Sequence, residues 1–494
     1  MTNYGWGILA YVALIFIAGV GVMPLVRRSG KRFIVAGKAL PFFFVGTTMM
    51  AQAIDANATM GNTGAVYGPG GWWAGFQFPL GLALCLVITG LFYAMPLNRL
   101  NLLTLPDYYY RRYGRLVEVL VAIAMAISFM ILVAGNLSGV SWIIHIAFGL
   151  TYLQALIGIS VVLFLYTMSG GMFSQVSTDI VMIYPSIIGF IGGFLFLYLT
   201  YGWDFFKPAI PAGHFDLSGL MYLKSGALLN WAGILALGLG DVVALDFMER
   251  VFAANSPRTA RNATFYAAAG TIIIGLAASF MGLMALKLSP NVAEPRMVLP
   301  TLAMGLPFIF GLFIMGGIIG AGMSTGDGGV LAISSVFGRN IVQRNILKIW
   351  QKHYSEQDRK ALDARLLWVT RVAAIPVMAA AIWIAIIKPE PGILLVLAFD
   401  VVFAGCFVPL TLGLYWKKAN TYGALASVIV GSLLRVILYY KIPPEWAGAD
   451  TLIPPLVSLL VMVPVSLLTQ KQDPPRHHIN DYVPSEEEVL STAY

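Results

Sequence analysis

Charge, cysteine and histidine are all scarce in this chain, and each scarcity excludes a class of function. Only 11% of the 494 residues are charged, whereas 59% are hydrophobic, which is a membrane composition rather than a soluble one. Cys85 and Cys406 lie in apolar stretches, so neither a disulfide framework nor a cysteine metal site is expected. The five histidines are scattered, and no nucleophile–base or metal-ligand constellation accompanies the carboxylates, so we do not expect an enzyme.

Positive charge exceeds negative charge, with a formal net charge of +8. The basic residues stand in short loops between apolar segments, as the positive-inside rule expects, and this distribution argues against nucleic acid as a partner. The lipid bilayer is the expected partner, and the chain is expected to be a monomer or a weak homo-oligomer.

Apolar windows of about 20 residues recur along the chain and predict an all-α polytopic membrane protein. Thirteen transmembrane helices are expected, near residues 5–26, 40–66, 72–97, 116–147, 151–170, 174–201, 230–252, 262–287, 302–337, 366–388, 391–416, 420–441 and 451–469. The first window is long enough to span and is followed by basic residues, so it is expected to anchor the chain rather than to be removed.

Basic residues gather in alternate loops, which the positive-inside rule places in the cytoplasm. They are Arg27, Arg28, Lys31 and Arg32; Arg99, Arg111, Arg112 and Arg115; Arg258 and Arg261; Arg339, Arg344, Lys348, Lys352, Arg359 and Lys360; and Lys417 and Lys418. We therefore expect a multi-pass protein of the bacterial inner membrane with the N-terminus outside. Residues 1–470 form the predicted transporter domain, and residues 471–494 form a cytoplasmic, disordered tail.

Carboxylates stand inside several predicted spans, where each costs about 2.5–3.5 kcal/mol on insertion scales and needs a partner or a function. They are Asp55, Asp179, Asp241, Asp246, Asp327 and Asp400.

The first of them, Asp55, stands in MMAQAIDANATMGNTG, where polar and small residues interrupt an apolar helix. A helix broken there exposes backbone carbonyls that suit a small hard cation, and broken helices at mid-membrane mark transporter sites. The alternative is a kinked structural helix whose Asp is satisfied by neighbouring hydroxyls.

A second polar stretch, GAGMSTGDGG, places Ser324 and Asp327 three residues apart on one helix face, next to Thr325. Oxygen-only ligands suit sodium or another hard cation. The alternative is close helix packing through small residues.

Asp241 and Asp246 differ in their local partners. Asp246 stands four residues before Arg250, which predicts an ion pair along one helix face. Asp241 has no basic residue three or four positions away, so it is the better candidate for a solute contact.

Four stretches resemble motifs of the sodium/solute symporters, which include bacterial sodium/proline and sodium/sialic acid symporters and sodium/glucose cotransporters. They are AGKALPFFFVGTTMMAQ, SGGMFSQVSTD, ERVFAANSPRTARNA and LYWKKANTYGALAS. The resemblance runs from about Arg32 to Lys471. It implies a leucine-transporter-type inverted five-plus-five repeat, with core repeats at about 40–201 and 230–416, one helix before them and two after. The first helix of each repeat is broken in that fold.

The resemblance also implies a sodium site. Carried over residue by residue, its ligands are the backbone carbonyls of Ala53, Ala56 and Ala321 and the hydroxyls of Ser324 and Thr325.

Some relatives hold a second ion, and here the chain departs from their pattern. Asp179 is present, but the family's downstream pair of serines is replaced by Asp327 and Gly328. Asp327 is then a stronger ion ligand, a replacement for the ion, or a proton carrier, and the sequence leaves these alternatives open.

Departures also affect the predicted solute site, which consists of Asp55, Asn57 and Asp241. Asp241 and Leu132 stand where the proline symporters have aromatic residues, so the pocket is not that of a proline carrier. A buried carboxylate facing the solute is most easily compensated by a cation, so we expect an amine-bearing or otherwise cationic solute.

The sequence thus predicts a symporter that imports a small organic solute with Na+ by alternating access and uses no organic cofactor. Two alternatives stay open. One is a proton-coupled carrier of the same fold, suggested by Asp327 and Asp400, and the other is a membrane sensor that works with a separate signalling partner.

Overall fold

The computed structural model describes residues 3–346 and 356–476, and its regular elements over them are all helices, apart from one isolated bridge between Leu40 and Ala254. Ten helices are long and apolar enough to cross a membrane, or up to twelve if each of two bent helix pairs is one span. The protein is therefore a multi-pass membrane protein. The expected span at 40–66 is built as two short helices, and most of the predicted tail, residues 477–494, lies outside the described residues.

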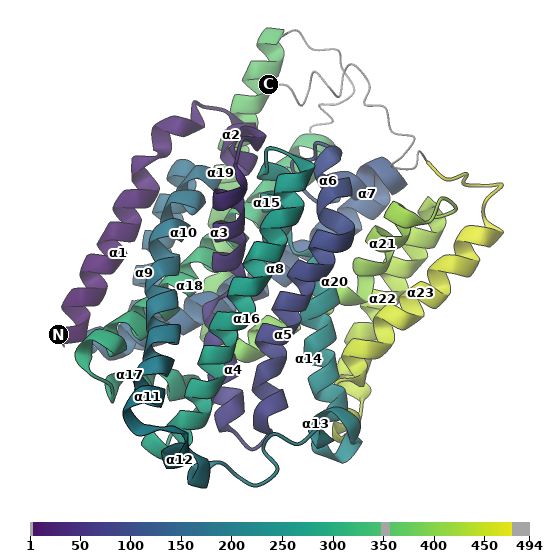
Figure 1. Ribbon diagram of the computed structural model, residues 1–494. Helices are drawn as coiled ribbons and strands as arrows, with labels where there is room; N and C mark the ends of the chain where they lie inside the picture. Colours follow the sequence, from purple (N-terminus) through teal and green to yellow (C-terminus); the bar gives the residue numbers. More distant parts are fainter. Residues whose placement is uncertain (1–2, 347–355, 477–494) are drawn as a thin grey trace.

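The helices form one bundle in which most elements run roughly along a common direction (Figure 1). The longer ones are α1 (Asn3–Gly21), α3 (Phe42–Ala53), α4 (Ala56–Tyr67), α5 (Gly71–Ile88), α8 (Arg115–Phe148), α9 (Tyr152–Gly170), α10 (Met172–Ile187), α14 (Ala227–Leu239), α16 (Pro257–Leu288), α18 (Phe308–Val336), α19 (Glu356–Ile387), α20 (Pro391–Gly405), α22 (Thr421–Lys441) and α23 (Ala449–Leu468). The shorter ones are α2 (Gly30–Val35), α6 (Ala94–Arg99), α7 (Pro106–Tyr113), α11 (Gly193–Tyr201), α12 (Trp203–Phe206), α13 (Ser218–Met221), α15 (Leu245–Ala253), α17 (Val298–Met304) and α21 (Phe407–Tyr415).

Three helices of the bundle are interrupted. The backbone leaves helical geometry at Ile54 and Asp55, between α3 and α4. The short 3₁₀ turn η7 (Gly240–Val243) separates α14 from α15, and the chain bends there by 45°. A bend of the same size separates α20 from α21 near Cys406. These interruptions expose peptide groups inside the bundle, away from lipid, which is where membrane proteins tolerate them.

Helix α18 lies at the centre and packs against α3, α4, α8 and α10. It is buried along nearly its whole length, and small residues allow its neighbours to approach closely. A side chain at Gly322 would collide with Ala56, just beyond the first break. The α18 backbone therefore lies directly against the start of α4.

A network of ion pairs joins α7, α8 and η9 (Phe337–Ile346) at the end of the bundle that is uppermost in Figure 1. Asp107 contacts Arg339 and Arg344 at 2.8 Å each, and Glu118 also contacts Arg344. Asn340 donates to both carboxylates. Burial raises the pKa of Asp107, but the nearby guanidinium groups outweigh it and hold the pKa well below its ordinary value.

The last two long helices are also connected to the bundle by charge. Arg435 on α22 contacts Asp400 on α20 at 2.7 Å and Asp450 on α23 at 3.1 Å. The side chains of Arg435 and Asp400 are largely buried. This pairing accounts for Asp400 within the structure, so the carboxylate has a resident partner.

The Asp107 network generates a stability prediction. Replacing Asp107 with Asn removes the carboxylate that contacts both Arg339 and Arg344, and breaking a largely buried pair in this way costs roughly 3–5 kcal/mol. We expect a clear fall in the melting temperature of the purified protein.

The matched control is Glu294→Gln, which removes a half-exposed carboxylate paired with Arg296. Such surface pairs contribute about 0–1 kcal/mol, so this variant should melt close to wild type. Equal melting temperatures for Asp107→Asn and Glu294→Gln would contradict the structural role of the network. The pKa of Asp107 is lowered in the folded protein. Its contribution to the free energy of unfolding is therefore complete above the ordinary carboxyl pKa, and it is lost as the pH falls below that value.

Candidate functional site

Asp55 stabilises the break between α3 and α4, called the first break below. Its carboxylate accepts a hydrogen bond from the backbone amide of Ala58 at 2.5 Å, which makes it the N-terminal cap of α4. The side chains of Asn57 and Asn136 donate to its other oxygen at 3.0 and 2.9 Å. The carboxylate is buried, and the protein itself supplies its partners.

Asn136 on α8 uses both ends of its amide at this break. Its nitrogen donates to Asp55, and its oxygen accepts from the backbone amide of Ala56 at 3.1 Å. Of the three residues predicted to contact solute, Asp55 thus serves as a cap. Asn57 keeps a buried side-chain oxygen for which the described residues supply no hydrogen-bond donor.

The predicted sodium ligands come from the break and from α18, and the structure brings these two elements together. Thr325 donates from its hydroxyl to the main-chain oxygen of Gln52 at 2.9 Å, next to Ala53. Ser324 lies one residue before it and is fully buried. Helix α3 ends here, so its last carbonyls lack intrahelical partners and carry the negative end of the helix dipole. Carbonyl and hydroxyl oxygens at a helix C-terminus are a donor set that fits a hard monovalent cation.

Asp241 lies in η7, at the break between α14 and α15, and is 1% exposed. Neither of its carboxylate oxygens has a hydrogen-bond partner among the described residues. The charged groups that act on it are carboxylates, namely Asp55 and Asp246. A buried carboxylate in this setting requires a cation or a proton from outside the protein's own side chains.

Asp179 and Asp327, the predicted second ion or proton site, lie in one cluster. Arg250 contacts Asp179 at 3.5 Å, with both side chains fully buried. Thr178 donates to Asp327 at 3.5 Å, and the two carboxylates interact electrostatically. The sequence separates these aspartates widely, but α10 and α18 bring them together.

The predicted ion pair between Asp246 and Arg250 does not form as a direct side-chain contact among the described residues, although the charge of Arg250 still acts on Asp246. Arg250 donates to the main-chain oxygen of Asp246 at 3.1 Å, while its charge faces Asp179 on α10. The carboxylate of Asp246 instead accepts from the backbone amide of Phe247 at 2.8 Å. Helical spacing places Asp246 and Arg250 on one face, but the guanidinium group of Arg250 contacts the buried carboxylate of Asp179 on α10 instead.

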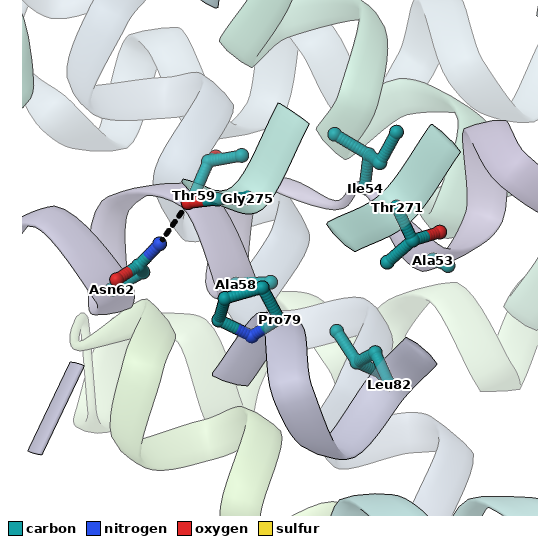
Figure 2. Close-up of a pocket in the computed structure, with 9 residues that line it drawn as sticks. All are labelled: Ala53, Ile54, Ala58, Thr59, Asn62, Pro79, Leu82, Thr271 and Gly275. Carbon is teal, nitrogen blue, oxygen red and sulfur yellow. Dashed lines mark hydrogen bonds between the residues drawn. The ribbon is translucent and has the colours of Figure 1, made fainter. Parts of the chain in front are cut away.

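A pocket adjoins the first break on the side of α5 and α16 (Figure 2). Its lining residues are Ala53, Ile54, Ala58, Thr59, Asn62, Pro79, Leu82, Thr271 and Gly275. Asn62 donates to the carbonyl of Gly275 at 2.9 Å across it. The cavity volume is about 10 Å³, which is about the space that one water molecule needs. In this conformation the pocket has no room for an organic solute.

Sequence reasoning missed two residues that organise the site, Gln52 and Asn136, and did not predict the contact of Arg250 with Asp179. Each is a polar residue in a largely apolar stretch, which is the signal that could have identified them. Their partners lie on other helices, so no spacing rule along the chain could have paired them.

The family model for the sodium:solute symporter family matches residues 33–431. The high affinity choline transporter 1 of Mus musculus is 27% identical over 455 residues, covering 87% of this chain and 75% of that protein. The sodium/pantothenate symporter of Haemophilus influenzae is 26% identical, covering 93% and 95%. The sodium/glucose cotransporter of Vibrio parahaemolyticus is 24% identical, covering 98% and 92%.

Solved structures show the same fold. A Na+-coupled sialic acid symporter in a substrate-bound outward-open state superposes with a TM-score of 0.79 at 18% identity, covering 97% of this chain and 99% of that one. A nucleobase-cation-symport-1 family transporter in a closed conformation gives 0.56 at 12% identity, covering 93% and 97%. The match of the family model to most of the chain shows that this protein belongs to the sodium:solute symporter family.

Proposed function

We propose that this protein imports a small organic cation across the bacterial inner membrane together with sodium. The observation that carries the proposal is the pairing of two sites around the helix breaks. One is an oxygen-only donor set between α3 and α18, and the other is the buried, unpartnered carboxylate of Asp241. Membership of the sodium:solute symporter family supports sodium as the coupling ion.

Sodium binds, in this proposal, to the carbonyls of Ala53, Ala56 and Ala321 and to the hydroxyls of Ser324 and Thr325. The close contact of α18 with the start of α4, through Gly322 and Ala56, supports this placement. Because the ligands belong to α3, α4 and α18, bound sodium stabilises the arrangement in which these three helices lie together. The ion thereby favours the conformation that orders the adjoining solute site.

The solute binds near both breaks, with its cationic group at Asp241 and Asn57 as a polar neighbour. Both oxygens of Asp241 lack hydrogen-bond donors within the described structure, so an ammonium group that carries N–H donors satisfies them best. The mouse relative is named for choline, whose quaternary ammonium group has no N–H donor. We therefore propose a primary or secondary amine as the preferred solute of this chain.

Transport proceeds by alternating access, with the N-terminus outside and the C-terminus in the cytoplasm. Inward movement of a net positive charge gains about 2.3 kcal/mol per charge per 100 mV of membrane potential. Sodium and solute are coupled because each favours the same occluded arrangement of the broken helices.

The cluster of Asp179, Arg250 and Asp327 supports a second candidate for coupling, a proton. Two carboxylates share one guanidinium there, and Asp327 keeps an oxygen without a hydrogen-bond partner in the described chain. A proton on this pair would balance the charge that Arg250 leaves uncompensated. Under this alternative, sodium would be replaced or accompanied by a proton.

The sodium site generates the first functional prediction. Ser324→Ala removes one ion ligand, and we expect it to weaken sodium binding roughly tenfold, equivalent to about 1.4 kcal/mol. The measurement is the sodium-dependent rise in melting temperature of the purified protein, since a ligand of the folded state raises it.

The matched control is Ser334→Ala on the same helix. The hydroxyl of Ser334 is equally buried but donates to the Val330 carbonyl one turn earlier. It should retain the wild-type sodium response. Stability that follows pH and ignores sodium in wild type would favour the proton-coupled alternative.

Asp241 generates the second functional prediction. We expect ethanolamine-type primary amines to raise the melting temperature in sodium more than their N-trimethylated counterparts, and Asp241→Asn to abolish the response to amines. The control is Glu390→Gln, which changes a surface carboxylate paired with Lys388. Binding of only neutral or anionic solutes, unaffected by Asp241→Asn, would contradict the proposal.

A further inference from the structure

The side chain of Gln52 occupies an unusual position beside the proposed sodium ligands. It belongs to the last turn of α3 and is 3% exposed. Its amide nitrogen donates to the main-chain oxygen of Ser324 at 2.6 Å and to the hydroxyl oxygen of Ser324 at 2.9 Å. The carbonyl can only accept a hydrogen bond, so the nitrogen, not the oxygen, of the Gln52 amide must face it.

The same residue also binds the other hydroxyl of the donor set. Thr325 donates to the main-chain oxygen of Gln52 at 2.9 Å. Gln52 thus joins α3 to α18 twice, through its side chain at Ser324 and through its backbone at Thr325. Both hydroxyls that the sodium proposal requires are engaged by one residue.

The amide oxygen of Gln52 has the opposite environment. It is buried and finds no hydrogen-bond partner in the described chain. It lies over Gly328, one helical turn after Ser324, and a Cβ on Gly328 would collide with it. The absence of a side chain at Gly328 therefore leaves the space that the amide of Gln52 occupies. The amide oxygen accepts no hydrogen bond there from the described residues.

We infer that the Gln52 amide replaces sodium in the ion-free carrier. Its N–H groups carry the positive end of the amide dipole and contact an oxygen that would otherwise ligand the ion. The contact holds α3 against α18 when no sodium is bound, so the empty carrier can keep these helices together as it returns. Sodium must displace the amide to bind Ser324. This inference rests on the proposed sodium site and adds a residue that opposes sodium binding.

Removing the amide of Gln52 should lower both the melting temperature of the ion-free protein and the sodium concentration that half-saturates the melting shift. Gln52→Leu keeps the size of the side chain but deletes its hydrogen bonds, so the ion-free protein should melt at a lower temperature than wild type. Sodium no longer competes with the amide, so the sodium concentration for half of the maximal melting shift should fall by roughly 3- to 10-fold, the effect of one or two ordinary hydrogen bonds.

A second variant reaches the same contact from the opposite helix. Gly328→Ala places a methyl group where the amide lies and should displace it, again lowering the half-saturating sodium concentration. The control is Gly316→Ala on α18, where an added Cβ meets its nearest neighbours only at ordinary contact distances of 3.7 Å or more. This control should bind sodium as wild type does.

The outcomes separate the possible roles of Gln52. A higher half-saturating sodium concentration in Gln52→Leu and Gly328→Ala would overturn the inference, because it would make the amide an ion ligand. An unchanged concentration in both variants would also overturn it. A wild-type protein without any sodium-dependent shift would instead overturn the proposed sodium site, so the two failures are distinguishable.

Discussion

The need to satisfy the peptide groups exposed at the break between α3 and α4 determines how the centre of this protein is built. An interrupted helix inside a membrane leaves donors on one side of the break and acceptors on the other, and lipid can satisfy neither. Asp55 and Asn136 supply partners for the donors of α4. Thr325 supplies a donor for the acceptors of α3. Helices α8 and α18 therefore have to lie against the break, and the surrounding bundle follows from that requirement.

The two aspartates at the helix breaks differ because their surroundings differ. Asp55 receives three donors from the protein and acts as a helix cap. Asp241 receives none from the described residues, although it is just as buried. One carboxylate thus stabilises the fold, while the other keeps both oxygens without a hydrogen-bond donor from the described residues. A sequence alone shows two aspartates in two broken helices and cannot assign these different roles.

Local features were predictable from the sequence, and contacts between helices were not. The break at Asp55 follows from polar, small and weakly helix-forming neighbours, and it was expected. Asp241 has no basic residue three or four positions away along the chain, and within the described residues its carboxylate also finds no hydrogen-bond donor. The contact of Arg250 with Asp179 was not predicted, because spacing along a helix gives no information about a residue on α10. Gln52 was missed for the same reason, since its partner Ser324 is 272 residues away along the chain.

The pairing of Arg435 with Asp400 and Asp450 has a consequence for the two helices that follow the core. Asp400 sits on a bent helix in contact with α4, α8 and η7, and its counter-charge comes from α22. Without α22, the bundle would contain a buried anion with no neutralising group. The terminal pair of helices is thus an integral part of the folded carrier rather than a separable addition. Removing α22 and α23 from the protein would require a second change at Asp400.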